Sequence, residues 1–317
     1  MSWLDEQLRG HEITRTGEVI VTRDRPWGTM LRADTTQGPV WLKAPGPASV
    51  FEVELYQLLC EATPDHVLVP LGVDVERGWV LLPDGGTSLG EGLSDTELTD
   101  ALTEALPRYA QLQRDLAPLT ERMLTLGVTD MRPAVMPQRF DEAVEVTGRW
   151  VAELGDAGDR DAHRQVVAKR ATFVSWCERL GEGAAPASLD HNDLHPWNIL
   201  VDGAGRTCFY DWGDGVLAHS FASMLMGVGF LRYRRRVGPD DPDVLRLRDA
   251  YLEAWTDLAP RGELVEELDV ACWVAVVART LTWERSVRAG VDGSEEFTRA
   301  PWETLRALLA DSWIAAM

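Results

Sequence analysis

Short runs of β-branched and apolar residues, separated by turn residues, dominate the first 85 positions of the chain. Runs of this length and composition are typical of strands. They predict five strands, at 18–23, 29–34, 39–44, 66–75 and 78–83. Between the third and the fourth, residues 48–62 place apolar side chains such as Phe51, Leu55 and Leu59 at helical spacing, which predicts one helix.

The segment 83–92, PDGGTSLGEG, contains a proline and four glycines and marks the strongest boundary in the chain. Beyond it, apolar residues recur mainly at helical spacing. Helices are expected at 94–116, 137–154 and 161–180 and from about residue 219 onward, with two short strands, 198–202 and 207–212, in between. Ser94 and Glu97 have the spacing of a capping box at the start of the first of these helices. The order of elements predicts an α+β protein with a small sheet lobe, a glycine hinge and a larger helical lobe.

The formal net charge is -20, from 51 acidic and 31 basic residues. Nucleic-acid-binding proteins usually carry a basic surface, so nucleic acid is not expected as a partner. An acidic cleft is compatible with a cationic ligand, because it concentrates cations. An acidic surface that serves only solubility is the simpler alternative.

Neither a membrane span nor a secretory signal is expected. The longest apolar runs are too short to cross a bilayer, and the start, MSWLDEQLRG, lacks an apolar core. The four cysteines are widely spaced, without a disulfide framework, and the six histidines form no zinc pattern with them. This cysteine usage favours a reducing cytoplasm.

Lysine is rare: among 31 basic residues only Lys43 and Lys169 are lysines. In a chain that uses arginine by default, a lysine can be required for its compact ammonium group. Lys43 ends a predicted strand and precedes the helix that carries Glu52 and Glu54.

The stretch LDHNDLHPWNILVD, residues 189–202, concentrates hydrogen-bonding and titratable side chains in one turn before a strand. Within it, residues 191–198 fit the pattern His-x-Asp, four residues, Asn of a kinase catalytic loop. The sequence DWG at 211–213 follows and looks like the metal-binding Asp-Phe-Gly element.

Taken together with Lys43 and a helix glutamate, these motifs resemble the protein-kinase fold. In their specific form, HNDLHPWNIL and YDWGD, they are similar to the aminoglycoside phosphotransferase and choline kinase family of small-molecule kinases. A protein kinase is disfavoured, because no Ala-Pro-Glu element or activation segment is evident. The resemblance implies a bilobal protein-kinase-like fold, with a nucleotide-binding lobe at 1–83, a hinge at 84–92 and a catalytic, substrate-binding lobe at 93–317.

The resemblance also implies a role for each motif residue. Asp193 would be the base that orients the acceptor hydroxyl and accepts its proton. Asn198 and Asp211 would hold Mg²⁺, which suits a sparse set of oxygen ligands. Lys43 would hold the α- and β-phosphates of ATP. Its partner is expected to be Glu52, on the apolar face of the helix, with Glu54 as the alternative.

Other residues of the two loops have structural and functional interpretations. His191 is expected to tie the catalytic loop to the metal loop by hydrogen bonds. His195 is expected to brace its loop, although it could also touch substrate. Trp197 and Trp212 are expected to pack. Asp214 could contact metal or a cationic substrate, or be a solvated loop acid.

The nucleotide-binding segments depart from the protein-kinase pattern. The loop RDRPWGT has a single glycine, and the amides of Gly28 and Thr29 are the expected phosphate contacts. Adenine is expected at the hinge residues Leu82, Pro83, Asp84 and Gly85. Since proline has no N–H, the hydrogen-bond donor to adenine would come from one of the last two.

The acceptor pocket is expected in the helical lobe. On the predicted helix 268–287, Trp273 and Glu284 share one stripe with Val277 and Thr280. A tryptophan and an acid could hold a cationic sugar or amine. A tryptophan stripe also suits core packing.

The sequence thus predicts an enzyme that transfers the γ-phosphate of ATP, with Mg²⁺, to a hydroxyl of a small and cationic molecule. Aminoglycosides and related antibiotics are favoured acceptors because of the acidic charge, and such an activity would confer antibiotic resistance. A metabolic kinase of a sugar, amino alcohol or homoserine-like substrate is the alternative. A nucleotide-binding pseudokinase is a third hypothesis, disfavoured by the intact motifs. The oligomeric state stays open.

Overall fold

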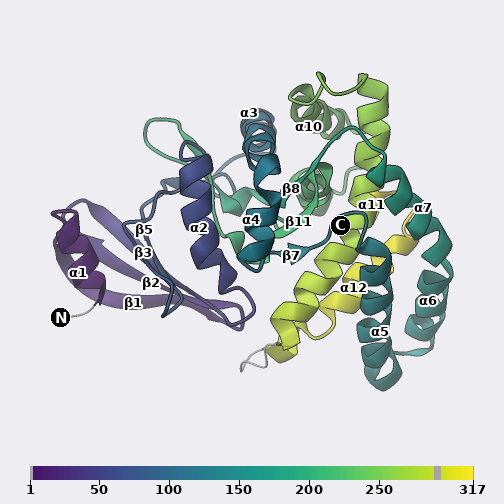
Figure 1. Ribbon diagram of the computed structural model, residues 1–317, viewed down its shortest axis with the longest axis horizontal. Coiled ribbons are helices and arrows are strands. Elements are labelled where there is room, and N and C mark those ends of the chain that lie inside the picture. The colour runs from purple at the N-terminus through teal and green to yellow at the C-terminus, as the bar shows by residue number, and fades with distance from the viewer. Residues whose placement is uncertain (1–2, 289–293, 317) are drawn as a thin grey trace.

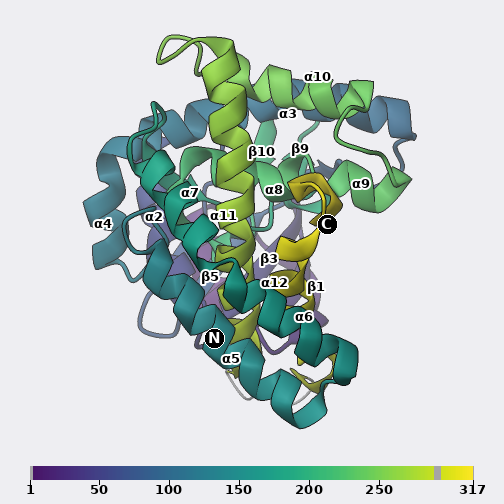
Figure 2. The ribbon, with the colours of Figure 1, turned by 90° about the vertical axis from the view of Figure 1, so that its right-hand side faces the viewer.

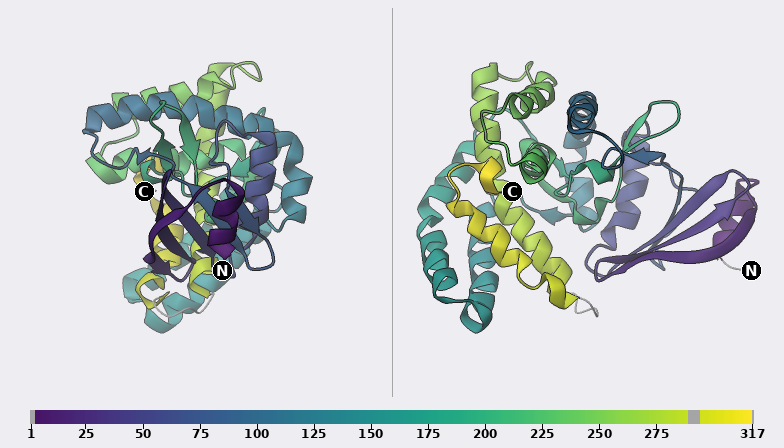
Figure 3. Two further views of the ribbon diagram at one scale, coloured as in Figure 1. Left: turned by 90° about the vertical axis from the view of Figure 1, so that its left-hand side faces the viewer. Right: turned by 180° about the vertical axis from the view of Figure 1, so that it is seen from behind.

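The computed structural model describes residues 3–288 and 294–316. Figure 1 shows a small N-terminal lobe built on a sheet and a larger, mainly helical lobe. The two lobes lie at opposite ends of the long axis, as the view from behind also shows (Figure 3). The predicted α+β architecture is confirmed.

The small lobe holds one antiparallel sheet with the strand order β1-β2-β3-β5-β4. Its strands are β1 (Arg15–Arg25), β2 (Gly28–Thr35), β3 (Gly38–Pro45), β4 (Gly72–Asp74) and β5 (Trp79–Pro83). All five predicted strands are present. The fourth is shorter than the run 66–75 that predicted it, and this run contains Pro70, which has no N–H for a strand ladder.

Two helices flank this sheet (Figure 1). The expected helix is α2 (Phe51–Ala62), which packs toward the large lobe. A second helix, α1 (Trp3–Gly10), was not predicted. It buries only Leu4 and Leu8, which pack on the opposite face of the sheet. Two apolar residues give too weak a periodic signal to reveal a helix.

The glycine-rich segment crosses from one lobe to the other. Within it, β6 (Thr87–Ser88) pairs with β9 (Ile199–Val201), which pairs in turn with β10 (Thr207–Phe209). Gly86 has φ of +88°, and a Cβ there would lie 2.2 Å from the carbonyl oxygen of Val201. Glycine therefore permits both the turn and the close approach to β9.

The large lobe is mainly helical. Its helices are α3 (Asp95–Leu116), α4 (Thr120–Thr125), α5 (Met136–Leu154), α6 (Ala157–Ala168), α7 (Arg170–Gly181), α8 (Met224–Gly227), α9 (Phe230–Arg235), α10 (Pro242–Glu253), α11 (Arg261–Arg288) and α12 (Ala300–Arg306). Ser94 and Glu97 form the predicted capping box of α3. The single helix expected at 161–180 is two helices, because the chain breaks at Lys169.

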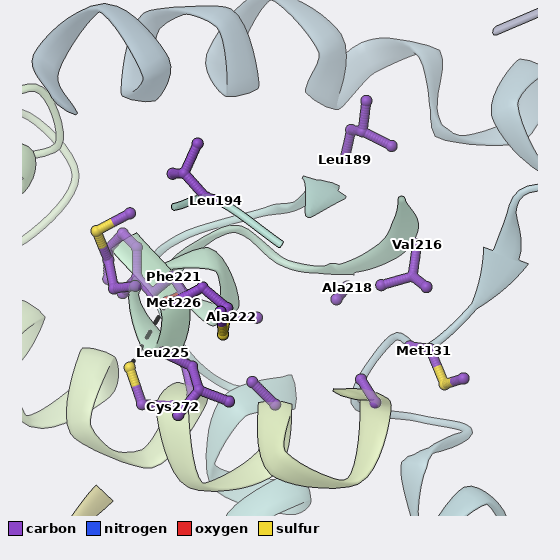
Figure 4. Packing of buried hydrophobic residues seen from close by; sticks show 14 of the residues in the cluster. Met131, Leu189, Leu194, Val216, Ala218, Phe221, Ala222, Leu225, Met226 and Cys272 are labelled. Carbon is purple, nitrogen blue, oxygen red and sulfur yellow. Dashed lines mark hydrogen bonds between the residues drawn. The ribbon is translucent and has the colours of Figure 1, made fainter. Parts of the chain in front are cut away.

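Helix α11 runs through the large lobe and contacts α5, α7, α8 and α12 (Figure 2). Beside it lies a small sheet with the order β7-β11-β8, made of β7 (Thr129–Asp130), β11 (Val216–His219) and β8 (Ala187–Asp190). Loop 191–198 follows β8. Figure 4 shows Leu194 of this loop among buried side chains of neighbouring elements, including Phe221 and Cys272. The loop is therefore anchored in the core of the lobe.

No helix within residues 3–288 and 294–316 is long and apolar enough to cross a membrane. All four cysteines are free thiols.

Candidate active site

Lys43 lies on β3, an inner strand of the sheet, and is only 4% exposed. Its ammonium donates to Oε1 of Glu52 at 2.5 Å and to a carboxylate oxygen of Asp211. Glu52 is fully buried in the first turn of α2 and also accepts the backbone N–H of Trp212 at 2.9 Å. Lys43 is thus paired with Glu52, not with Glu54, and joined directly to the DWG loop.

Two carboxylates share this one ammonium. Burial lowers the pKa of Lys43, but Asp211 and Glu52 outweigh it and raise the pKa above its usual value. Burial raises the pKa of Glu52 to about 6 in spite of Lys43. For Asp211, the charges of Lys43 and of Arg23, which donates at 3.2 Å, outweigh burial and hold the pKa well below its usual range. Asp211 is therefore ionised at neutral pH.

Loop 191–198 bends sharply after β8. Asn192 has φ of 58°, in the left-handed region that asparagine tolerates better than most residues. Its side chain donates to Thr282 of α11 at 2.7 Å, and its backbone N–H donates to Asp190 at 2.8 Å. Asn198 closes the loop, because its amide donates to the carbonyl oxygen of Asp193 at 2.9 Å. These bonds fix the backbone on both sides of Asp193.

The two histidines of the loop make different contacts. His191 is buried, its Nε2 lies 2.9 Å from the carbonyl oxygen of Tyr210, and its ring packs against Trp212. It ties loop 191–198 to the DWG loop. Nε2 of His195 lies 3.4 Å from the carboxylate of Asp193.

Arg279 of α11, which belongs to none of the predicted motifs, lies beside Asp193. It donates to Oδ1 of Asp193 at 2.8 Å and to Oδ2 of Asp214 at 2.6 Å. Burial alone would raise the pKa of Asp193, but the charge of Arg279 and the hydrogen bond with His195 outweigh it and lower the pKa to about 2. Asp193 is therefore ionised at neutral pH.

These groups surround one cavity of about 460 Å³ between the lobes. Its charged lining residues are Arg23, Lys43, Glu52, Glu91, Asp193, Asp211, Asp214 and Arg279. A second cavity, of about 370 Å³, shares part of this lining, including Arg23, Glu91 and Tyr210. The second cavity is bounded by the expected adenine contacts, Leu82, Pro83, Asp84 and Gly85. The two adjoining cavities have room for a nucleotide and a second small molecule.

The family model described as the phosphotransferase enzyme family matches residues 29–264. The chain belongs to this family. No curated protein sequence matches it.

Solved structures of small-molecule kinases share the fold of this phosphotransferase. A macrolide 2'-phosphotransferase from Brachybacterium faecium is 17% identical with a TM-score of 0.60, over 94% of this chain and 97% of that one. A choline kinase from Streptococcus pneumoniae, also solved with AMP, is 14% identical with a TM-score of 0.59, over 95% and 97%. An ethanolamine kinase from Plasmodium vivax is 12% identical with a TM-score of 0.62, over 98% and 88%.

The oxygen donors of the phosphotransferase site suit Mg²⁺. Asp211 offers a charged carboxylate, and no described residue donates a hydrogen bond to the amide oxygen of Asn198. Among residues 3–288 and 294–316, no group of three or more His, Cys, Asp or Glu side chains could hold a metal by itself. A metal here would need further ligands from phosphate and water, which is the coordination that Mg²⁺ prefers.

Four residues expected to contact ligands line neither of the two adjoining cavities. Gly28 and Thr29 are absent from both linings, although the adjacent Trp27 lines the charged cavity. Trp273 stacks on Trp176 of α7, with ring centroids 5.7 Å apart. Glu284 pairs with Arg288 and lines a separate cavity of about 430 Å³.

A different face of α11 lines the charged cavity, with Arg279, Trp283 and Ser286. Each residue turns an α-helix by about 100°, so a stripe chosen one position away faces another side. The sequence did contain a signal for this face: Arg279 ends the apolar run VACWVAVVA, and an arginine inside a buried helix needs a partner.

Proposed function

We propose that the protein is a cytoplasmic kinase that uses Mg²⁺ and ATP to phosphorylate a hydroxyl group of a small molecule. The observation that carries this proposal is the set of contacts in one cavity. Lys43 is bound to Glu52 and Asp211, and Asp193 and Asn198 line the same cavity. Phosphoryl transfer needs aligned reactants and balanced charge more than covalent help, and this set supplies both.

ATP would lie across the two adjoining cavities. Adenine would contact the hinge, where the carbonyl of Pro83 and an N–H of Asp84 or Gly85 are the matching groups. The phosphates would meet Lys43, whose ammonium is already directed into the charged cavity by Glu52. The AMP complex of the related choline kinase supports a nucleotide in this fold.

Asp193 would orient the acceptor hydroxyl toward the γ-phosphate and take up its proton. With a pKa of about 2 the carboxylate is a weak base, so its main contribution would be orientation, with proton transfer late in the reaction. Asn198 and Asp211 would hold Mg²⁺, which would neutralise charge on the phosphates.

The chemical class of the acceptor is the part of this proposal that the site constrains least. A net charge of -20 favours a cationic acceptor, such as an aminoglycoside or a related antibiotic. Asp214 lines the cavity but is already paired with Arg279, so a cation would rely more on the aromatic side chains of Trp27 and Trp283. The fold is shared with macrolide phosphotransferases and with choline and ethanolamine kinases, so resistance and metabolic roles are both proposed for testing.

A screen of ADP release tests the proposal. The purified protein would be incubated with ATP and Mg²⁺ against aminoglycosides, macrolides, sugars, choline, ethanolamine and homoserine, with an EDTA control. We expect Mg²⁺-dependent ADP release and a matching phosphorylated product with one acceptor class. Nucleotide binding without turnover of any acceptor would favour the pseudokinase hypothesis, and absence of nucleotide binding would refute both.

A further inference from the structure

Arg279 is a buried cation in the most apolar stretch of α11. The residue is 9% exposed, and the residues on either side of it, Ala278 and Thr280, are buried. A guanidinium in this position is costly unless its charge and its donors are matched. Arg279 is therefore held by specific partners, and those partners are the carboxylates of the active site.

The guanidinium bridges two loops. One nitrogen donates to Asp193 on loop 191–198, and the other donates to Asp214, which directly follows the DWG sequence. The planar group also lies over the ring of Trp283, one helical turn away, at 5.0 Å from its centroid. A guanidinium that donates from two nitrogens and also stacks on an aromatic ring has little freedom to rotate.

The orientation of the Asp193 carboxylate depends more on the Arg279 guanidinium than on its other neighbours. The contact with Arg279 measures 2.8 Å, whereas His195 and the amide of Asn198 both lie 3.4 Å from the other carboxylate oxygen. Among the described residues, only these two long contacts would hold the carboxylate without Arg279. Rotation about the side-chain bonds could then move its oxygens by an ångström or more.

The stacking partner of Arg279 is fixed from both lobes. Trp27, in the turn between β1 and β2, packs against Trp283 with ring centroids 6.2 Å apart. Phe297 stacks on Trp283 with ring centroids 5.9 Å apart and contacts Trp27 at 5.0 Å, so the three rings form one cluster. The small lobe thus contributes to holding the helix residue that carries the guanidinium.

We propose that Arg279 is the positioning residue for Asp193: by bridging to Asp214 and stacking on Trp283, it holds the carboxylate in the orientation that the acceptor hydroxyl requires. This inference rests on the proposed kinase function. It predicts that Arg279 acts mainly on the rate of phosphoryl transfer and little on nucleotide binding.

Steady-state kinetics of Arg279→Gln and Arg279→Lys, with the acceptor identified by the screen, test this role. Arg279→Gln should lower kcat by about 10²-fold, the effect of misplacing a reacting group by about 1 Å. The KM for Mg·ATP should change by less than about threefold. Arg279→Lys should recover part of the lost kcat, because lysine restores the positive charge but not the two fixed donors of the guanidinium. Arg288→Gln, which removes an exposed arginine of the same helix, is the matched control and should behave like the native protein.

A second variant locates the effect. Asp214→Asn weakens one arm of the bridge and should lower kcat by less than Arg279→Gln, and the double variant should be no slower than Arg279→Gln alone. A folded Arg279→Gln protein with native kcat, or one with raised kcat, would overturn the positioning role. So would multiplicative losses in the double variant, because they would mean that the two residues act independently.

The kinase function and this inference can fail separately. A native protein that phosphorylates no acceptor refutes the function before any variant is compared. The bridge is then decided by denaturant unfolding of Arg279→Gln, Asp193→Asn and the double variant. Non-additive midpoint shifts would support the contact between the two side chains, and additive shifts would overturn it.

Discussion

Replacing Lys43 with arginine keeps the positive charge and changes only its shape, so it tests the geometry of the site directly. A lysine at the surface of an edge strand would tolerate this change. Lys43 instead lies on an inner strand, 4% exposed, with its ammonium bound to Glu52 and Asp211. Arginine must therefore fit a larger, planar group where a compact one is enclosed.

The enclosed position of Lys43 sets the expected size of two effects, the loss of stability and the loss of rate. Overpacking a filled site costs about 1–3 kcal/mol, which corresponds to a loss of roughly a few degrees in melting temperature. The fold should survive. Displacement of the cationic group by about 1 Å from the phosphates would lower the rate by on the order of 10²-fold, equivalent to ~2.7 kcal/mol in the barrier. The catalytic loss should therefore exceed the change in the folded population, which is what separates a role in the reaction from a role in stability.

The assay is steady-state ADP release by Lys43→Arg, with thermal melting as the folding control. Lys169→Arg is the matched substitution, because Lys169 is the other lysine of the chain and lies at the end of α6, away from the cavity. It should retain native activity and melting temperature. Native kcat and KM in Lys43→Arg would remove Lys43 from the site and refute the geometry proposed here.

Three further perturbations probe the same cavity. Asp193→Asn should lower kcat by about 10²-fold or more and leave nucleotide affinity nearly unchanged; near-native turnover would contradict its role. Asn198→Ala and Asp211→Ala should each weaken binding of Mg·ATP more than binding of metal-free nucleotide in calorimetry, whereas equal losses would indicate structural roles. Burial raises the pKa of the Glu52 carboxyl to about 6 in the folded protein, whereas the unfolded chain releases this proton near the ordinary pKa of 4.5. Ionisation of Glu52 therefore lowers the stability of the folded protein as the pH rises from 4.5 to 6, by up to ~2 kcal/mol above pH 6. The melting temperature of nucleotide-free Glu52→Gln should therefore rise relative to that of the native protein as the pH increases through this window. Its rate of phosphoryl transfer should fall, but less than that of Lys43→Arg. A difference in melting temperature that does not change with pH would contradict the raised pKa of Glu52.

The local patterns of the sequence determined most of the framework. Four of the five strands, α2 and the cap of α3 follow from residue periodicity and capping chemistry within a few positions, whereas β4 is shorter than predicted. The apolar face of α2 was enough to select Glu52 over Glu54 as the buried partner of Lys43. The glycines of the hinge marked the passage between lobes, because only glycine fits beside β9 at Gly86.

Only the tertiary structure decided which side of α11 meets the active site. Between Val270 and Thr282 this helix is buried on nearly all sides, so residue periodicity alone does not orient it and allowed a stripe through Trp273 and Glu284 as readily as the stripe that lines the cavity. Arg279 indicated that a charged partner was needed, but not which one. The contact between Asp193 and Arg279 joins residues 86 positions apart. Sequence periodicity extends over a few turns of one helix or strand. A contact of this kind depends instead on how α11 is rotated about its axis and packed against loops from other parts of the chain. That rotation is set by the combined fit of all the neighbours of the helix.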